Sequence, residues 1–270
     1  MITASLVLYN TRYSDLNTIL KCVVASQIAR LYVIDNSPTD DLRKVVASLM
    51  EGKPYEYIHG QGNVGFGHAN NIGIKRAMEV GSDYHIVLNP DIIFKPDVIE
   101  KLNGYMDSNE DVGYILPKVV YPNGELQYLC RLMPTPYDIF ARRLLPRSLG
   151  SKQLERYEMR RMGYDKVFNC PILSGCFMFI RMDALKTVGL FDERYFMYFE
   201  DFDLIRRIHR KYKTIYYPEV SIIHNHAAEH RHNKRLFKES VKSAIRYFNK
   251  WGWLFDKERR IVNRNTEREY

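Results

Sequence analysis

Two acidic segments of this chain carry the residue types of an active site. The first is an apolar run of strand length that ends in Asn89-Pro90-Asp91, and the second is 195–203, where three carboxylates lie among six aromatic or methionine residues. Carboxylates in apolar surroundings cost free energy unless they are paired, hydrogen-bonded or bound to a metal ion. The two segments therefore predict one site with a metal ion and a base. The alternative is two unrelated features, a solvated turn and an acidic helix start.

The carboxylate of Asp91 suits a hard cation. Mg²⁺ or Mn²⁺ takes one or two protein carboxylates and fills its other positions with phosphate oxygens and water. Asn89 stands where many such sites carry a second carboxylate, which predicts a cation held firmly only with substrate. His224, at the end of a short apolar run, is the expected further ligand, with His226 as the alternative. A zinc site could instead form from the histidines of this segment, although no cysteine pair supports it: His224, His226, His230 and His232.

Glu200 and Asp201 begin an expected helix, and Asp201 is the expected catalytic base, with Glu200 as the second candidate. The dipole at a helix N-terminus lowers the pKa of a carboxyl group, whereas apolar neighbours raise it. A base that takes the proton of an acceptor hydroxyl needs such tuning. The alternative is a charged helix cap in which Asp203 pairs with Arg206 or Arg207.

The segment 60–67 holds the pattern G-x-G-x-x-G between a strand and a helix, and Asp83 follows about twenty residues later, as in dinucleotide-binding folds. That fingerprint belongs to the first strand–helix turn, whereas this segment follows the third expected strand. Glycine-rich loops bring backbone N–H groups close to sugars or phosphates, so we expect a nucleotide-sugar here. The alternatives are NAD bound at Gly60–Gly65 and a plain tight turn.

Asp35 and Asn36 end the second expected strand. A carboxylate there can accept the imide N–H of uracil or thymine, which favours a uridine or thymidine donor. The alternative is an Asx turn that caps the next helix.

The elements that must position these residues alternate over residues 1–90. Strands are expected at 4–8, 31–34, 55–58 and 84–88, and helices at 15–26, 40–50 and 68–80. Such alternation predicts a mostly parallel, Rossmann-like α/β sheet flanked by helices, with ligands at the carboxyl ends of the strands. Further strands are expected at 112–120, 175–180, 214–217 and 220–224, with a helix at 201–211. The basic stretch 131–166 has three prolines and no clear period, which is typical of a functional loop.

The composition bounds the class of protein. At 270 residues and 46% apolar, the chain is long enough for one large globular domain. No apolar run approaches the ~20 residues that a membrane-spanning helix needs, and we expect no signal peptide because the N-terminus lacks a basic leader. Four scattered cysteines without a Cys-x-x-Cys pair indicate a reducing cytosol. The +8 net charge is concentrated in 141–161 and 231–270, which suits anionic lipid, pyrophosphate or nucleic acid.

The segment 231–270 is expected to begin with an amphipathic helix. Its apolar stripe is Phe237, Val241, Ala244, Ile245 and Phe248. Its basic stripe, with tryptophan at the end, is Lys238, Lys242, Arg246, Lys250 and Trp251. An apolar face flanked by Lys and Arg is typical of a helix that lies on an anionic membrane surface. The alternatives are contact with a second subunit and packing on the catalytic domain.

Together these segments resemble a family-2 inverting glycosyltransferase of the GT-A fold, in its bacterial rhamnosyltransferase branch. The resemblance covers residues 1–230 and is carried by VLYN at 7–10, VIDNS at 33–37, GNVGFGHANNIG at 62–73, LNPD at 88–91, SGCFM at 174–178, and GLFDE with EDFDL between 189 and 204. It implies Asp201 as the base, Asp91 with His224 as ligands of Mg²⁺ or Mn²⁺, and Asp35 as the contact of the nucleotide base. It further implies nucleotide-binding roles for Tyr9, Asn36, Asn63, Gly67 and Asn89, and acceptor-binding roles for Gly175 and Tyr198.

By this resemblance the donor is dTDP-L-rhamnose or a UDP-sugar, and the acceptor is a polyprenyl-pyrophosphate-linked saccharide in cell-surface polysaccharide synthesis. We expect a nucleotide-sugar-binding half at 1–92, an acceptor-binding and catalytic half at 93–230, and a basic amphipathic segment at 231–270. The enzyme is expected in the cytoplasm, on the inner face of the cell membrane, as a monomer or homodimer and without a nucleic-acid partner. The other function classes are an NAD-dependent oxidoreductase and a lipid- or nucleic-acid-binding protein without catalysis.

Overall fold

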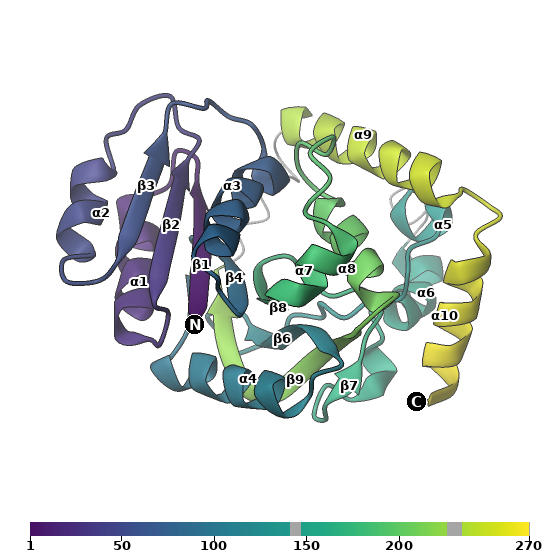
Figure 1. Ribbon diagram of the computed structural model, residues 1–270. Helices are drawn as coiled ribbons and strands as arrows, with labels where there is room; N and C mark the ends of the chain where they lie inside the picture. The colour runs from purple at the N-terminus through teal and green to yellow at the C-terminus, as the bar shows by residue number, and fades with distance from the viewer. Residues whose placement is uncertain (141–146, 226–233, 270) are drawn as a thin grey trace.

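The structure of the protein is a computed structural model that describes residues 1–140, 147–225 and 234–269 (Figure 1). Its first half alternates strand and helix, as predicted. The elements are β1 (Ile2–Leu8), α1 (Tyr13–Ala25), β2 (Arg30–Asp35), α2 (Arg43–Leu49), β3 (Tyr55–His59), α3 (Phe66–Glu79) and β4 (Tyr84–Leu88). β1 pairs in parallel with β2 and β4, and β2 pairs in parallel with β3. Nearly every residue of β1, β2 and β4 is buried, because helices cover both faces of the sheet.

The second half adds strands of both directions. Its elements are β5 (Ile92–Ile93), α4 (Pro96–Ser108), β6 (Val112–Val120), α5 (Pro136–Ile139), α6 (Arg147–Tyr157), η2 (Arg160–Met162), β7 (Phe168–Asn169), β8 (Phe177–Arg181), α7 (Met182–Val188), α8 (Glu200–His209), β9 (Lys213–His224), α9 (Lys234–Trp251) and α10 (Lys257–Glu269). β8 lies antiparallel between β4 and β6 and so joins the two halves. The strand order is β3-β2-β1-β4-β8-β6-β9-β5, with β7 paired to β9.

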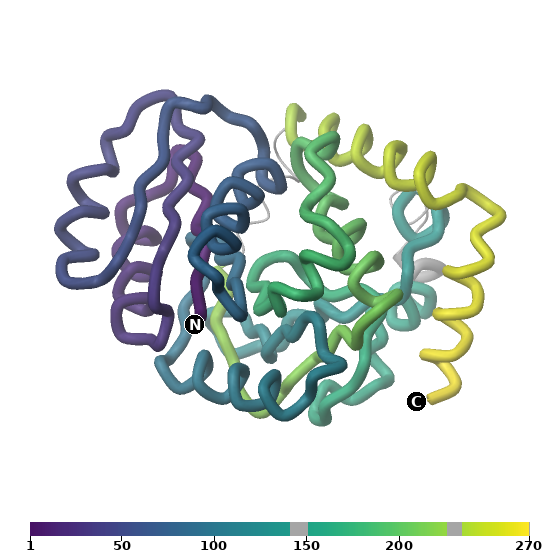
Figure 2. The backbone as a smooth tube through the Cα atoms, viewed as in Figure 1, coloured from purple at the N-terminus to yellow at the C-terminus, as the bar shows by residue number. Residues whose placement is uncertain are grey.

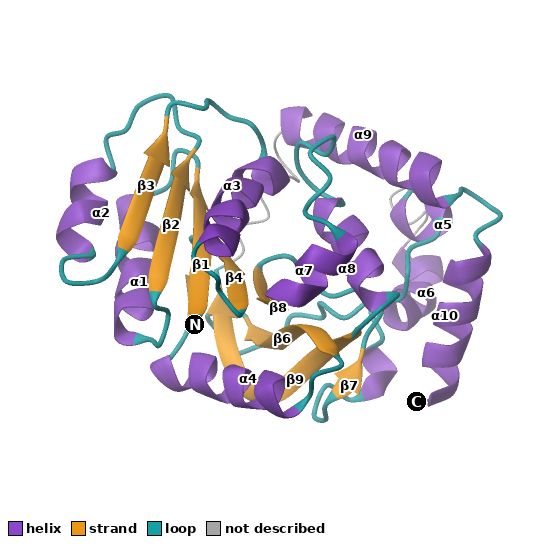
Figure 3. Cartoon of the chain, in the orientation of Figure 1, coloured by secondary structure: helices purple, strands orange, loops and turns teal. Residues whose placement is uncertain are grey.

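The sheet lies between two layers of helices. α1, α2 and α4 belong to one layer, and α3, α7 and α8 belong to the other. Figure 3 shows the strands at the centre of the molecule, with the loops that follow β1, β2 and β3 gathered at one edge of the sheet. The α/β class and the sheet flanked by helices are therefore confirmed. Among the described residues, no helix combines the length and the apolar character needed to cross a bilayer.

Two expectations for the second half were wrong. The strands expected at 214–217 and 220–224 form one strand, β9, whose pairing with β6 shifts register after Tyr217. The interruption that Pro218 and Glu219 make in the apolar pattern is thus a local irregularity and not a strand end. The stretch 131–166, expected as a loop, contains α5, α6 and η2. Its helical pattern is weak because α6 is very polar on average.

The C-terminal helices pack against the second half of the chain. α9 lies beside residues 190–200, and α10 lies beside the chain from 131 to 157, as the tube in Figure 2 shows. Their contact forms an apolar cluster of its own, separate from the main core: Met133, Ile172, Tyr195, Phe199, Phe202, Ala244, Tyr247 and Phe248. This cluster includes Tyr195 and Phe199 of the loop that leads into α8, and so helps to hold that loop in place.

Candidate active site

The two acidic segments meet at the start of β8. The backbone N–H of Gly175 donates a hydrogen bond to Oδ2 of Asp201 over 3.0 Å, and the carbonyl of Cys176 accepts one from the backbone N–H of Asn89 over 3.1 Å. The pKa of the Cys176 thiol is raised to about 12 by its burial, and the charges of Asp91 and Asp201 both contribute. The two segments predicted to share one site are therefore joined through the backbone of two consecutive residues, Gly175 and Cys176.

Asp201 has the surroundings of a base. It lies in the first turn of α8, part of its side chain stays accessible, and its Oδ1 accepts a hydrogen bond from the backbone N–H of Phe202 over 2.9 Å. Burial raises the pKa of Asp201 above its ordinary value, although the backbone donors and the charge of Arg131 oppose the rise. When ionised, a carboxylate whose pKa is raised is a stronger proton acceptor than an exposed aspartate.

Glu200, the second candidate, has a different environment. Its side chain is buried and its Oε2 has no hydrogen-bond partner among the described residues. Burial, reinforced by the charge of Asp201, raises the pKa of Glu200 well above its ordinary value. Asp201 accepts two backbone hydrogen bonds whereas Glu200 Oε2 has no donor among the described residues, so the geometry favours Asp201 over Glu200 as the base.

α8 begins in a strained turn. Tyr198 and Phe199 both have left-handed backbone angles, with φ of 67° and 65°. Such conformations cost non-glycine residues about 1–3 kcal/mol each and persist only where the surroundings impose them. Here Phe199 is packed in the cluster with Tyr247, and the turn brings Asp201 to the N–H of Gly175. Tyr198 belongs to this turn, and the acceptor-binding role predicted for it stays a prediction.

The third carboxylate, Asp203, is part of the scaffold. It is fully buried and binds Arg207 at 3.0 Å, Lys250 Nζ at 2.7 Å and the indole N–H of Trp251 at 2.8 Å. The predicted pairing with Arg207 is confirmed. Arg206 instead makes a double hydrogen bond to Asp256, with both N–O distances 2.8 Å.

Asp91 and His224 lie together, as predicted. Oδ2 of Asp91 is 3.4 Å from Nε2 of His224, because β5 pairs with β9 and Ile92 lies opposite His224. His224 is buried, whereas about a quarter of the Asp91 side chain is exposed. The two ligands therefore form a site that opens to solvent on the Asp91 side.

Gln127 orients the His224 ring. Its side-chain amide donates to the carbonyl of His224 over 2.8 Å and to that of Val120 over 3.4 Å. Its Oε1 is therefore the acceptor that lies 3.1 Å from His224 Nδ1, which puts the ring proton on Nδ1. Nε2 then presents a lone pair toward Asp91, and histidine metal ligands typically donate their other ring N–H in this way.

The donor set fits a hard cation. Two lone-pair atoms, Asp91 Oδ2 and His224 Nε2, face each other, and Oδ1 of the nearby Asn89 is buried without a hydrogen-bond partner among the described residues. Oxygen ligands with one carboxylate suit Mg²⁺ or Mn²⁺ completed by substrate phosphates. In the part of the chain that the structure describes, no group of three His, Cys, Asp or Glu residues could hold a metal. The zinc alternative needs His226, His230 and His232, which lie outside the described residues.

At the carboxyl ends of β1 and β2, Asp35 is buried and its carboxylate is held by two donors. Oδ1 accepts from the backbone N–H of Ser37 over 2.9 Å, and Oδ2 accepts from the Tyr57 hydroxyl. The Ser37 bond is the Asx turn considered as the alternative, and it leaves the carboxylate with further lone pairs for a nucleotide base. Gln61 donates to the Asp35 carbonyl and to Asn36 Oδ1 over 2.9 and 3.0 Å. Tyr9, at the end of β1, is 47% exposed.

The glycine-rich segment contacts the second acidic segment. The N–H of Phe66 donates to the carbonyl of Phe196 over 3.0 Å, and Gly65, at a φ of 89°, has no room for a side chain because a Cβ would lie 2.2 Å from that oxygen. Asn63 is exposed and accepts from the Gly65 N–H over 3.2 Å. Gly67 is buried and a Cβ there would lie 3.0 Å from Phe191 Cβ; the nucleotide-binding role predicted for this glycine stays a prediction.

Four residues around the site escaped the sequence analysis: Arg131, Gln127, Tyr57 and Gln61. Arg131 affects the pKa of Asp201, and the other three orient His224 and Asp35. Tyr57 and Tyr55 alternate in β3, the strand that pairs with β2. This position in the neighbouring strand could have indicated Tyr57 as a partner of Asp35. Nothing in the sequence near Arg131 or Gln127 indicates which distant residue each one meets.

The basic stripe predicted for membrane contact is largely bonded to the protein. Lys250 binds Asp203 and Asp192, Trp251 donates to Asp203, and Arg246 donates to the backbone carbonyl of Arg194. These three side chains are therefore engaged within the protein, and the membrane-binding roles predicted for them stay predictions. Lys242 pairs with Glu239 at 2.8 Å on the same helix, and Lys238 is exposed.

The apolar stripe of α9 is divided between two environments. Ala244 and Phe248 are buried in the cluster with α8, whereas Phe237 and Ile245 are about half exposed. The structure therefore shows the third alternative, in which the apolar face of α9 packs on the catalytic domain. The exposure of Phe237 and Ile245 follows from their position on the outer side of a helix that already buries its other face.

A parallel α/β half with polar side chains at its strand ends, joined by β8 to a mixed half that brings Asp201 and the Asp91–His224 pair to the same region, has the architecture of a nucleotide-sugar transferase of the GT-A fold. Residues 6–189 match the family model described as "Glycosyl transferase family 2". This chain belongs to glycosyl transferase family 2, within which it is rhamnosyltransferase-like. The oxidoreductase alternative is therefore wrong.

The chain is 27% identical over 225 residues to the rhamnosyltransferase WbbL of Escherichia coli, covering 79% of this chain and 78% of that protein. It is 29% identical over 183 residues to the N-acetylglucosaminyl-diphospho-decaprenol L-rhamnosyltransferase of Mycobacterium tuberculosis, covering 61% of this chain and 57% of the relative. A solved structure of GalNAc-T7 with UDP, GalNAc and Mn²⁺ has the same fold, with a TM-score of 0.62 and 16% identity. That match covers 83% of this chain and 43% of the other.

Proposed function

We propose that this chain is a metal-dependent, inverting hexosyltransferase that moves L-rhamnose from dTDP-L-rhamnose to a hydroxyl of a polyprenyl-pyrophosphate-linked saccharide. The observation that carries the proposal is that the Gly175–Cys176 backbone links the two acidic segments: the Gly175 N–H binds Asp201, and the Cys176 carbonyl binds the N–H of Asn89, two residues before Asp91 and its neighbour His224. A base and a cation can therefore act on one bound sugar. The names of the bacterial relatives support the donor sugar and the lipid-linked acceptor.

In the proposed reaction, Asp201 accepts the proton of the acceptor hydroxyl. The hydroxyl oxygen forms a bond to the anomeric carbon while the bond from that carbon to the diphosphate oxygen breaks. The nucleoside diphosphate leaves with the electron pair, and one displacement inverts the anomeric configuration. The raised pKa of Asp201 strengthens it as a base, and its two backbone donors hold the carboxylate in place before the acceptor binds.

The chain's own residues would hold a divalent cation at the leaving group. Asp91 and His224 would bind it, Asn89 Oδ1 is a further candidate ligand, and phosphate oxygens would complete the coordination. When bound, Mg²⁺ or Mn²⁺ neutralises the charge that develops on the leaving diphosphate. The Mn²⁺ in the GalNAc-T7 structure supports this cofactor class.

The donor is proposed to bind in the first half, residues 1–92, with the base against Asp35 and Asn36 and the Tyr9 ring beside it. The Tyr57 hydroxyl and the Ser37 N–H fix the Asp35 carboxylate as an acceptor for an imide N–H. Thymine and uracil both carry that group, so a UDP-sugar is the second candidate donor. The acceptor would bind in residues 93–230, near Gly175 and Tyr198, and the segment 231–270 supports that half.

A donor panel tests the proposal. The protein would be incubated with dTDP-L-rhamnose, a UDP-hexose or GDP-mannose, a short-chain polyprenyl-pyrophosphate GlcNAc, and Mg²⁺, Mn²⁺ or EDTA. We expect mass spectrometry to find transfer of rhamnose only with the dTDP donor and a metal ion, and NMR to find inversion at the anomeric carbon. Efficient transfer from GDP-mannose, full activity in EDTA or a retained configuration would each contradict a named part of the proposal.

A further inference from the structure

The turn between α9 and α10 presents the most exposed large apolar side chains that the structure describes. Leu254 is 78% exposed and Phe255 is 96% exposed. Exposing two neighbouring apolar side chains to water is costly, at about 25 cal/mol per Å² of apolar surface. Their neighbour Trp253 is anchored, since its indole N–H donates to Asn249 over 2.8 Å and its ring stacks on Phe140.

Arg259 anchors the turn to the start of α10. It donates to the carbonyl of Trp253 over 2.9 Å and to that of Gly252 over 3.3 Å, and Asp256 Oδ1 accepts from the N–H of Arg259 over 2.9 Å. These bonds hold the two ends of the turn, and Leu254 and Phe255 lie between them.

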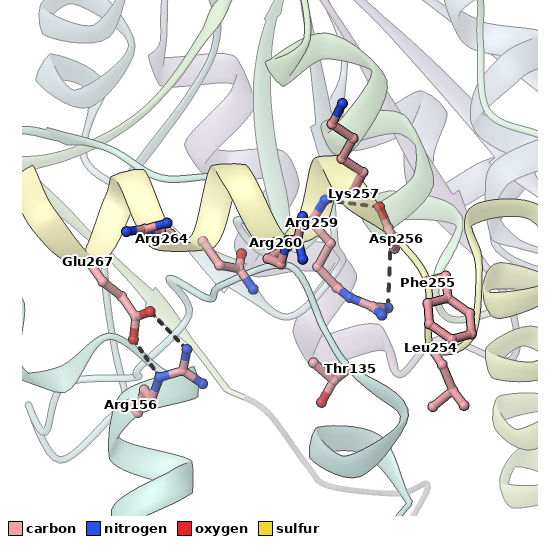
Figure 4. A pocket seen from close by; sticks show the side chains of 11 residues that line it. Thr135, Arg156, Leu254, Phe255, Asp256, Lys257, Arg259, Arg260, Arg264 and Glu267 are labelled. Atoms are coloured by element: carbon pink, nitrogen blue, oxygen red, sulfur yellow. Dashed lines mark hydrogen bonds and ion pairs between the residues drawn. The ribbon is translucent and has the colours of Figure 1, made fainter.

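Unpaired cations lie next to this apolar tip. Lys257, Arg260 and Arg264 recur on one side of α10, all three are exposed, and no ion pair joins them to another described residue. The acidic neighbours are neutralised elsewhere: Glu258 by Arg206 and Arg210, and Glu267 by Arg156 (Figure 4).

The cations and the tip enclose one pocket. Its cavity of about 540 Å³ is lined at one end by Leu254 and Phe255 and along its length by Lys257, Arg260 and Arg264 (Figure 4). Apolar groups next to uncompensated positive charge match the boundary of an anionic bilayer, where acyl chains lie beneath phosphates.

We propose that the α9–α10 turn docks the protein on an anionic phospholipid bilayer. Leu254 and Phe255 insert among the acyl chains, and Lys257, Arg260 and Arg264 contact headgroup phosphates. This surface differs from the basic stripe of α9, most of which is bonded to the protein. A second copy is a poorer occupant, because a two-fold contact on this tip would bring like charges together. The inference does not depend on the proposed function.

Vesicle co-sedimentation of the full chain tests the proposal. The probes are phosphatidylcholine vesicles with and without phosphatidylglycerol, at low and high salt. The test variants are Leu254→Ser/Phe255→Ser and Lys257→Glu/Arg260→Glu/Arg264→Glu. The matched control is Phe237→Ser/Lys238→Glu, which removes an exposed apolar side chain and a cation from α9. A Phe255→Trp variant reports insertion directly through quenching by brominated lipids.

We expect binding that requires phosphatidylglycerol and weakens with salt. Each test variant should bind at least about tenfold more weakly, and the control should bind normally. Phe255→Trp should be quenched. Three results would overturn the proposal: no binding by the natural sequence, full binding by the serine variant, or a greater loss in the α9 control. A dimer that Leu254→Ser/Phe255→Ser dissociates, without vesicle binding, would assign the tip to a subunit contact instead.

Discussion

Gly175 and Asp201 are packed so closely that a side chain on the glycine would displace the aspartate. A Cβ at Gly175 would lie 2.8 Å from Asp201 Cβ and 3.0 Å from Oδ2, whereas the Gly175 N–H donates to that oxygen over 3.0 Å. The glycine thus has two roles. Its N–H orients the proposed base, and the absence of a side chain leaves the space that the Asp201 carboxylate occupies.

Gly175→Ala should lower turnover without weakening the binding of donor or metal. The added methyl group shifts the Asp201 carboxylate, and sub-ångström errors in the position of a catalytic group can cost about 10²-fold in rate. Gly104→Ala is the control, because a Cβ there meets nothing within 4 Å. Calorimetry with dTDP and Mn²⁺ should give the same affinity for both variants. A Gly175→Ala enzyme with normal turnover would show that the contact does not position the base.

Asp201→Asn should keep donor binding and lose roughly 10²–10⁴ in turnover, the usual consequence of removing a general base. An exposed aspartate is protonated near pH 3.9. Because the pKa of Asp201 is raised, turnover of the natural enzyme should begin to fall at a higher pH than this as the solution is acidified. Single-turnover rates over a pH series measure both effects. If the asparagine variant turned over at nearly the natural rate, the base would have to be sought elsewhere.

Glu200→Gln should raise the free energy of unfolding relative to the natural chain, and this gain should be larger at neutral pH than at acid pH. In the unfolded chain Glu200 ionises near its ordinary pKa of about 4.3, whereas in the folded chain burial raises its pKa well above that value. The unfolded state therefore binds fewer protons, and stability falls as the pH rises through this window. Glutamine does not titrate and escapes that loss. Thermal unfolding at pH 4 and pH 7 checks the difference, and equal shifts at both values would contradict it.

The sequence predicts the first half of the fold well because its signals are local. Strands such as 84–88 are apolar along their whole length and are separated by amphipathic helices, so period and length identify them. The second half is harder. The register of β9 changes after Tyr217, and α6 is too polar for a period to stand out. The register shift of β9 and the helical state of α6 both depend on contacts with residues that are distant in the sequence.

The candidate site divides in the same way. Asp91 and Asp201 lie in recognisable motifs, because a carboxylate within an apolar segment can be identified from the sequence alone. The residues that orient them do not, because Gln127 meets His224 across 97 positions of the chain. The basic stripe of α9 shows the same limit: helical spacing indicates that Lys250 and Trp251 share a side with other residues, but not that the buried Asp203 faces them.

Gln127→Met should weaken metal binding about 10–100-fold, the usual cost of removing the partner that orients a metal-binding histidine. Methionine has similar length but cannot accept the Nδ1 proton of His224, so the ring loses its fixed tautomer. Gln127→Glu is the conservative control, since a carboxylate still accepts that proton. Calorimetry with Mn²⁺ in the presence of dTDP should separate the two variants. Equal losses in both would show that packing at position 127, and not the hydrogen bond to His224, controls the site.

Arg206→Met should destabilise the fold by about 3–5 kcal/mol, because breaking a buried ion pair leaves an uncompensated charge. Arg206 and Asp256 are both almost fully buried and are joined by two hydrogen bonds of 2.8 Å. Arg210→Met is the matched control: Arg210 binds Glu258 as Arg206 does, but its side chain is 46% exposed, and exposed pairs contribute about 1 kcal/mol or less. The double variant Arg206→Met/Asp256→Leu should recover much of the loss, since it removes both charges together. Urea unfolding measures all three, and a loss in Arg206→Met no larger than that in Arg210→Met would mean that the pair does not hold the C-terminal segment on α8.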